Sequence, residues 1–265
     1  MGTQGLQPKK SLGQHWLHDE LSLTAMVTCG QVQQGDTVLE IGPGLGTLTE
    51  YLVEAVGDSG QVVALEYDEE LAKQLPSRVP SKRLHVTYAD CLTFDYAILP
   101  RGYKVVANIP YYLTSNLLRV LSEHSNPPEV IALLVQKEVA ERVAAEPGDM
   151  SMLSVSVQLY YQATLADVVP AELFTPPPKV DSQIIQLIRR EQPLFDDLDH
   201  KAFFRVVKAG FSQRRKKLRS SMSAGLHLAK PEATALLERA GIDPNARPQE
   251  LSLQQWHHLY LVVSR

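Results

Sequence analysis

Short apolar segments rich in β-branched residues recur along the chain from Thr37 onward, and each is followed by a stretch in which apolar residues have helical spacing. Parallel strands that are covered on both faces have this continuous apolar character, and the intervening helices provide the cover. The pattern predicts an α/β fold with a mainly parallel sheet. Its first five strands are predicted at residues 37–41, 61–66, 84–88, 104–107 and 130–135.

Two later segments, residues 154–163 and 182–188, alternate between apolar and polar positions. The sequence between them is rich in proline and has no long helical period. Alternation of this kind is typical of strands with one solvated face. We therefore expect both segments to close the sheet as an antiparallel edge, which gives seven strands in all.

The pattern changes to helix after Pro193. Phe203, Val207 and Phe211 recur at four-residue spacing, and a second series begins at Leu218. Such spacing places an apolar stripe along each predicted helix. The change predicts a boundary near residue 190, with an α/β domain over residues 1–190 and a small all-α domain over residues 191–265.

Composition excludes several classes of protein. Of the 265 residues, 44% are hydrophobic, which is enough for a large core. No apolar run approaches the roughly 20 residues that a membrane span needs. The two cysteines cannot build a disulfide framework. A cytoplasmic protein that makes no contact with membranes is therefore expected.

The net charge of −4 conceals two parts of opposite sign. Residues 1–188 hold 12 Lys and Arg against 22 Asp and Glu, whereas residues 189–265 hold 14 against 8, so the two parts carry −10 and +6. Seven basic residues fall within one acid-free stretch of the second part: Arg205, Lys208, Arg214, Arg215, Lys216, Lys217 and Arg219. A charge run is often only a solvated face, but this one is dense enough to predict contacts with RNA phosphates.

A glycine cluster, Gly42-x-Gly44-x-Gly46, follows the first predicted strand directly and precedes a helix that begins near Thr47. Glycines at such a turn let the backbone approach a ligand closely. A dinucleotide-binding turn would have its third glycine at position 47, where this chain has threonine. The turn by itself therefore indicates either a nucleoside site or merely a tight connection.

Polar side chains stand at the ends of the next three strands. Glu66 ends the second strand, Asp90 follows the third and Asn108 follows the fourth. The carboxyl ends of parallel strands line the crevice in which open α/β sheets bind ligands. Each carboxylate alone could be a solvated loop residue, but together they predict a nucleoside-binding site in which Glu66 accepts hydrogen bonds from ribose hydroxyls.

The tetrapeptide Asn108-Ile109-Pro110-Tyr111 has the groups needed to methylate an exocyclic adenine amine. The lone pair of that amine is delocalised into the ring, so two oxygen acceptors on its hydrogens would localise the pair and aim it. The side-chain oxygen of Asn108 and the carbonyl of Ile109 can be these acceptors. Pro110 stiffens the loop, and Tyr111 and Phe174 can stack on the base, although both rings could instead be ordinary core aromatics.

These features resemble the S-adenosylmethionine-dependent rRNA adenine N6-dimethyltransferase family. The resemblance rests on the glycine turn, on Asn-Ile-Pro-Tyr and on the segment Phe-x-Pro-x-Pro-x-Val-x-Ser that begins at Phe174, and it extends over nearly the whole chain. The basic segment and the Arg-Pro-Gln-Glu-Leu-Ser terminus that begins at Arg247 are similar to the small-subunit branch. Membership implies a Rossmann-like class I methyltransferase fold.

The resemblance also implies roles for individual residues. Gly42 would lie at the amino-acid end of S-adenosylmethionine, Glu66 on its ribose and Asp90 on its adenine, and Gly44 would also contact the cofactor. Asn108 would lie between the cofactor and the target amine. The family's N-terminal Gly-Gln-Asn-Phe-Leu is here Gly-Gln-His-Trp-Leu, in which His15 and Leu17 are the expected cofactor contacts.

The implied reaction is methyl transfer to N6 of two adjacent adenines in the 3′-terminal hairpin loop of small-subunit (16S) rRNA. The expected partner is the assembling small subunit, and the protein is expected to act as a monomer without metal. A large-subunit (23S) rRNA methyltransferase, a non-catalytic RNA-binding assembly factor, a DNA adenine methylase and a nicotinamide dehydrogenase remain alternatives. The last would need a hydride-relay pair, for which the sequence offers no candidate.

Overall fold

The computed structural model describes residue 9 and residues 12–196, 198–213 and 215–264. These residues form two compact units. The sheet unit contains the described residues up to Glu141 together with Tyr161–Arg189, and the helical unit contains Arg142–Tyr160 and the described residues from Arg190 onward. Each unit has its own apolar core.

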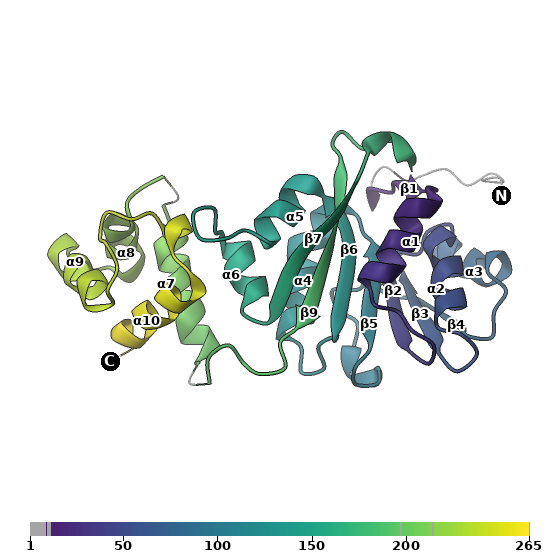
Figure 1. Ribbon diagram of the computed structural model, residues 1–265, viewed down its shortest axis with the longest axis horizontal. Coiled ribbons are helices and arrows are strands. Elements are labelled where there is room, and N and C mark those ends of the chain that lie inside the picture. The colour runs from purple at the N-terminus through teal and green to yellow at the C-terminus, as the bar shows by residue number, and fades with distance from the viewer. Residues whose placement is uncertain (1–8, 10–11, 197, 214, 265) are drawn as a thin grey trace. The chain divides into compact units, whose positions relative to one another are not determined.

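The sheet unit is built on seven strands in the order β4-β3-β2-β5-β6-β9-β7 (Figure 1). The first five pair in parallel, and β9 pairs antiparallel with both β6 and β7, as the sequence pattern predicts. Their bounds are β2 Thr37–Ile41, β3 Gln61–Glu66, β4 Leu84–Tyr88, β5 Lys104–Asn108, β6 Val130–Gln136, β7 Tyr161–Val169 and β9 Ser182–Arg189. The expected mainly parallel sheet with an antiparallel edge is confirmed.

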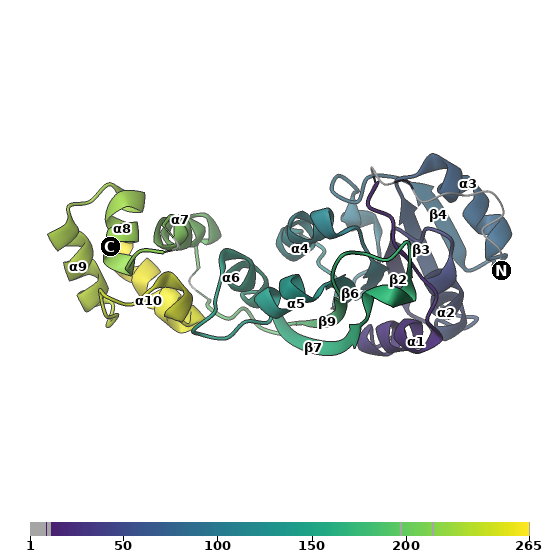
Figure 2. The same ribbon diagram turned by 90° about the horizontal axis from the view of Figure 1, so that it is seen from above.

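Helices cover both faces of this sheet. Figure 2 shows α1 and α4 on opposite sides of it. Apolar residues from α1, α2 and α3, among them Met26, Leu52 and Leu75, pack with strand residues in one buried cluster. The bounds are α1 Glu20–Cys29, α2 Thr47–Ala55, α3 Glu69–Arg78 and α4 Thr114–Glu123, with 3₁₀ turns at Tyr96–Ile98, Tyr111–Leu113 and Ala171–Leu173.

The direction of winding changes between β2 and β5. From β2 the chain continues to β3 and β4 on one side, whereas β5 and β6 lie on the other. Ligands of open α/β sheets bind at such a switch point, outside the carboxyl ends of the strands. A two-stranded ladder of β1 (Trp16–Leu17) and β8 (Phe174–Thr175) brings the N-terminal segment to the proline-rich loop.

The helical unit has a core centred on Phe203 and Trp256, both fully buried. Gly210 permits close packing there, since an added Cβ would collide with the Trp256 ring. The helices are α6 Met152–Gln158, α7 His200–Phe211, α8 Leu218–Leu226, α9 Lys230–Arg239 and α10 Leu253–Val263, with a 3₁₀ turn at Pro248–Glu250; α5, Lys137–Val143, contains the boundary. No helix in the described ranges is long and apolar enough to span a bilayer.

Two sequence-based expectations are corrected. Residues 154–158 are helical rather than extended, because Ser151 caps α6 through reciprocal hydrogen bonds with Ser154. The predicted first domain also loses Arg142–Tyr160, since Val155 and Leu159 pack in the same cluster as Phe203. The division near residue 190 recurs, but the helical unit is made of two chain segments.

Candidate active site

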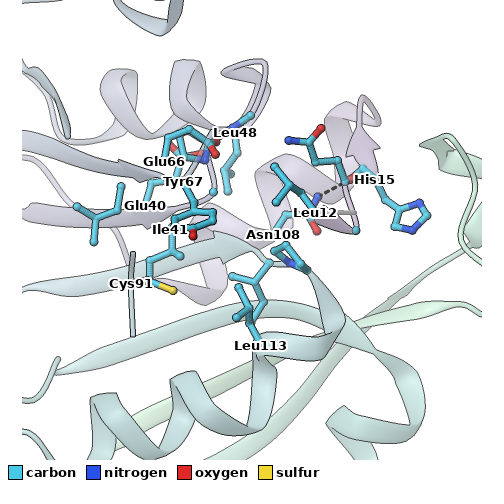
Figure 3. Close-up of a pocket in the computed structure, with 18 of the residues that line it drawn as sticks. Leu12, His15, Glu40, Ile41, Leu48, Glu66, Tyr67, Cys91, Asn108 and Leu113 are labelled. Carbon is cyan, nitrogen blue, oxygen red and sulfur yellow. Dashed lines mark hydrogen bonds between the residues drawn. The ribbon is translucent and has the colours of Figure 1, made fainter. Parts of the chain in front are cut away.

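A cavity of about 320 Å³ lies in the sheet unit at the switch point (Figure 3). Its walls come from the N-terminal segment and from the loops that follow β2, β3, β4 and β5. Ten residues predicted for the site line it: His15, Leu17, Gly42, Gly44, Glu66, Asp90, Asn108, Ile109, Pro110 and Tyr111. The fold therefore gathers most of the predicted cofactor and catalytic residues around one space.

The glycine turn forms one wall of this cavity. Gly42 and Gly44 have φ values of 70° and 56°, in the left-handed region that favours glycine. An added Cβ at Gly42 would point toward the Asn108 carbonyl at 3.8 Å. At Gly44 it would approach the Trp16 ring at 3.3 Å. Because Gly42 and Gly44 have no side chains, the backbone of the turn stays accessible to a ligand that would bind between β2 and β5.

Glu66 is held rigidly by the backbone around it. Its Oε2 accepts a hydrogen bond from Gly44 N at 3.0 Å, and its Oε1 accepts one from Asp68 N at 2.8 Å. Burial raises the pKa of Glu66, and these N–H donors oppose that rise. Asp90, which is half-buried, accepts from Leu92 N at 2.8 Å. Both carboxyl groups are therefore fixed in the wall before any ligand binds.

Glu40, which was not predicted as a site residue, also lines the cavity. It is 1% exposed, and its Oε2 has no hydrogen-bond partner among the described residues. Burial raises its pKa to about 8, and the nearby Glu66 carboxyl adds to the rise. The sequence signal was a single acid inside the apolar strand that leads into the glycine turn.

The side chain of Asn108 has a defined orientation. Its Nδ2 donates to the His15 carbonyl at 3.1 Å, the contact drawn as a dashed line in Figure 3. Because a carbonyl only accepts, this bond turns Oδ1 away from His15 and leaves it as an acceptor for another donor. The next residue, Ile109, is buried at 2% exposure and also lines the cavity. Asn108 Oδ1 and the Ile109 carbonyl are thus two oxygen acceptors on adjacent residues of one loop.

Phe174, predicted to stack on the target base, does not line the cavity. The ring is 3% exposed and packs in the sheet unit's core, and it is absent from the cavity wall. The reason is the β1–β8 ladder, which pairs Phe174 with the equally buried Leu17. Of the two predicted aromatic residues, Tyr111 lines the cavity and Phe174 packs in the core, and a stacking role for Phe174 stays a prediction.

The basic stretch lies in the helical unit, where α7 and α8 and their connection carry it. All its described members are exposed, and none forms an ion pair with another described residue. They are Arg205, Lys208, Arg215, Lys216, Lys217 and Arg219; Arg214 lies outside the described residues. We call these six residues the basic surface. Its charge is available to an anionic partner.

Comparison with known proteins identifies the family. The model of the family described as ribosomal RNA adenine dimethylase matches residues 5–264. The chain belongs to this family. A protein of Dehalococcoides mccartyi named ribosomal RNA small subunit methyltransferase A is 39% identical over 263 residues, which cover 98% of this chain and 89% of that protein.

Two solved structures share the fold over nearly the whole chain. A dimethyladenosine transferase from Plasmodium falciparum has a TM-score of 0.78 at 25% identity and covers 92% of this chain and 96% of its own. The 23S rRNA methyltransferase ErmE has a TM-score of 0.71 at 28% identity, and the match covers 94% of this chain and 100% of the ErmE chain. The class I methyltransferase fold is confirmed, and the protein is an enzyme.

S-adenosylmethionine is the methyl donor of this enzyme, and the cavity has suitable chemistry for it. The cofactor carries positive charge on its sulfonium and amino groups, and the carboxyl groups of Glu66 and Asp90 line the space together with that of Glu40, which its raised pKa keeps protonated at neutral pH. The partnerless Oε2 of Glu40 can satisfy a cationic donor. The open backbone at Gly42 and Gly44 leaves room beside them.

Proposed function

We propose that this protein transfers methyl groups from S-adenosylmethionine to N6 of two adjacent adenines in the 3′-terminal hairpin loop of small-subunit rRNA, and thereby forms N6,N6-dimethyladenosine. The fixed Asn108 amide beside an acidic cavity is the observation that carries this proposal. The choice of subunit is supported by relatives at 36–40% identity that are named for the small subunit, whereas the 23S enzyme is 28% identical.

When bound, the cofactor supplies an electrophilic methyl group on sulfur. In the first transfer Asn108 Oδ1 and the Ile109 carbonyl accept hydrogen bonds from the two N–H groups of the target amine and so localise its lone pair toward that methyl group. The methylated amine then releases one proton to solvent, and in the second transfer a single N–H remains to be held. Because the His15 carbonyl holds the Asn108 amide, little reorganisation is needed when the amine arrives. Tyr111 stacks on the base and fixes its plane.

The remaining roles follow from charge and position. Glu66 binds the ribose hydroxyls, Asp90 reads the cofactor adenine, and Leu17 and the glycine turn contact the cofactor through their backbone. The basic surface binds phosphates of the RNA and supplies affinity without reading sequence. The protein acts as a cytoplasmic monomer on the assembling small subunit.

The reaction is tested by incubating the protein with labelled S-adenosylmethionine and small subunits whose rRNA lacks the modification. Reverse transcription then maps the sites, because dimethylated adenine cannot form a Watson–Crick pair and stops the polymerase. We expect stops at two adjacent adenines in the 3′-terminal hairpin. Label on large-subunit RNA or DNA alone would overturn the choice of substrate, and no transfer to any nucleic acid would favour a non-catalytic assembly factor.

Replacing Arg215 and Lys216 together by alanine should weaken RNA binding and reduce its salt dependence. Each lost phosphate contact lowers the slope of log K against log salt by about 0.7–0.9, so the pair should lower it by about 1.5. Filter binding across a salt series measures the slope. Lys230→Ala with Arg239→Ala, which removes two exposed charges from α9, is the matched control. Equal slopes for both double variants would contradict the assignment.

A further inference from the structure

A second pocket, of about 420 Å³, adjoins the cofactor cavity in the sheet unit. Leu12 and Tyr67 line both spaces, so these two side chains form the wall between them (Figure 3). The other lining residues are charged and come from the N-terminal segment and from the start of α3: Lys9, Asp68, Glu69, Glu70 and Lys73. The volume is in the range of small-molecule sites. We call this space the outer pocket.

Tyr67 is the aromatic residue of the outer pocket. It follows β3 directly and is 58% exposed, and Tyr88, the last residue of the neighbouring strand β4, is 59% exposed. The two ring centroids are 6.4 Å apart and the ring planes differ by 28°, which is ordinary spacing for an aromatic pair. Tyr88 lines neither space. Its ring therefore limits the rotation of Tyr67, and the outer pocket has an aromatic face that is exposed and held in place.

The charged groups of the outer pocket form ion pairs with one another. Lys9 Nζ lies 2.8 Å from Asp68 Oδ2, and Lys73 Nζ lies 2.6 Å from Glu69 Oε1. The Glu70 carboxylate is 3.9 Å from Lys9 Nζ, which is beyond hydrogen-bond distance, so it keeps acceptors for another donor. Three carboxylates against two ammonium groups leave one net negative charge. The pocket therefore disfavours a simple anion and favours a ligand that donates hydrogen bonds.

The location of the outer pocket indicates RNA as the source of that ligand. The chain belongs to the ribosomal RNA adenine dimethylase family, so its substrate must approach the cofactor cavity, and Tyr67 lies in the wall of that cavity. An unpaired base has a flat face for an aromatic ring, and its exocyclic amine can donate to a carboxylate. The exposed ring and the free acceptors of Glu70 match these two features.

We propose that the outer pocket binds an unpaired nucleotide of the substrate RNA, with its base stacked on Tyr67 and its exocyclic amine hydrogen-bonded to Glu70. The proposal rests on the proposed function and deepens it by adding an RNA contact in the sheet unit. This contact differs in kind from that of the basic surface, because it uses stacking and amine recognition instead of phosphate charge. The two contacts therefore respond differently to salt.

Binding of the 3′-terminal hairpin without cofactor tests the ring. Tyr67→Ala removes it, and the affinity should fall by about 5- to 150-fold, which corresponds to about 1–3 kcal/mol for one stacked base. Tyr67→Phe keeps the ring and should retain most of the affinity. Because no phosphate contact is lost, both variants should keep the salt slope of the unaltered protein. Ile98→Ala, which truncates an exposed apolar residue outside both spaces, is the matched control.

Photo-crosslinking locates the base. Hairpins with 8-azidoadenosine at one loop position at a time are irradiated with the protein in excess S-adenosylhomocysteine, which fills the cofactor cavity. We expect one position, distinct from the target adenines, to be linked to the peptide that contains Tyr67, and Tyr67→Ala to lose the link. Purine riboside at that position lacks the exocyclic amine. It should weaken binding to the unaltered protein but not to Glu70→Ala.

The outcomes separate this proposal from the proposed function. If the unaltered protein methylates the small subunit while Tyr67→Ala binds RNA equally well and no position is linked to the Tyr67 peptide, the nucleotide site is wrong and the function stands. If Tyr67→Ala loses only affinity for S-adenosylmethionine, measured by calorimetry, the ring serves the cofactor and the site is again wrong. A reduced salt slope for Tyr67→Ala would contradict stacking. Absence of methylation by the unaltered protein would instead contradict the function itself.

Discussion

Replacing Asn108 by alanine will reduce methyl transfer to small-subunit RNA by about 10²–10³-fold, the loss typical of removing one preorganised polar group from an active site. The reason is that Asn108 lines the cavity and the bond between its Nδ2 and the His15 carbonyl leaves Oδ1 as an acceptor for another donor. Single-turnover rates measure the chemical step. The affinity for S-adenosylmethionine should stay largely intact, because Glu66 and the glycine turn remain.

The variant Asn108→Asp provides a sharper comparison. A carboxylate keeps an oxygen acceptor but cannot donate to the His15 carbonyl, so its orientation is no longer fixed. We expect a rate between those of the unaltered protein and Asn108→Ala, with similar thermal stability for both variants. Near-normal turnover of the alanine variant would refute the role assigned to Asn108.

The second large effect is a dependence of the free energy of unfolding on pH, which we expect from the buried carboxyl group of Glu40. Burial raises its pKa in the folded protein to about 8, whereas the unfolded chain should have a pKa of about 4.3. Between these values the folded state binds the proton and the unfolded state does not, so the free energy of unfolding falls as pH rises. The expected loss is on the order of 4 kcal/mol between pH 5 and pH 8, with little further change above pH 8.

Glu40→Gln should abolish this pH-dependent loss of stability, because glutamine keeps the size of the side chain but does not ionise. The difference in free energy of unfolding between variant and unaltered protein should therefore grow in favour of the variant from pH 5 to pH 8. Urea denaturation at a series of pH values measures it. Glu50→Gln, which removes an exposed carboxyl group from α2, is the control. Identical pH profiles for the two variants would exclude the assigned role of burial.

The sequence located the parallel strands well because each is a short, continuous apolar run. β2, β3 and β4 have the predicted bounds, and β5 extends one residue further, to Asn108. The strand-end rule then placed Glu66, Asp90 and Asn108 at one cavity without any knowledge of their contacts. Motifs whose function depends on position along a strand are thus predictable, since topology alone brings the strand ends together.

The sequence pattern predicted the wrong element where burial removes the difference in polarity between the two faces of a helix. Leu153, Ser154, Val155 and Val157 are all buried in α6, so the helix has no solvated stripe and its apolar alternation resembles a strand. Glu40 was missed for a related reason. An acid inside an apolar strand gives no periodic signal, and only the folded structure shows that its Oε2 lacks a partner.

By itself the sequence determined the fold class, the family-specific loop and the side chains at the strand ends, because these depend on local apolar pattern and on chain order. The tertiary structure alone decided which aromatic rings reach the cavity. Phe174 and His15 lie in segments far apart in the sequence, and the β1–β8 ladder buries the first while Pro176 turns the second toward Tyr111. Such choices arise from long-range pairing and packing, which no local pattern encodes.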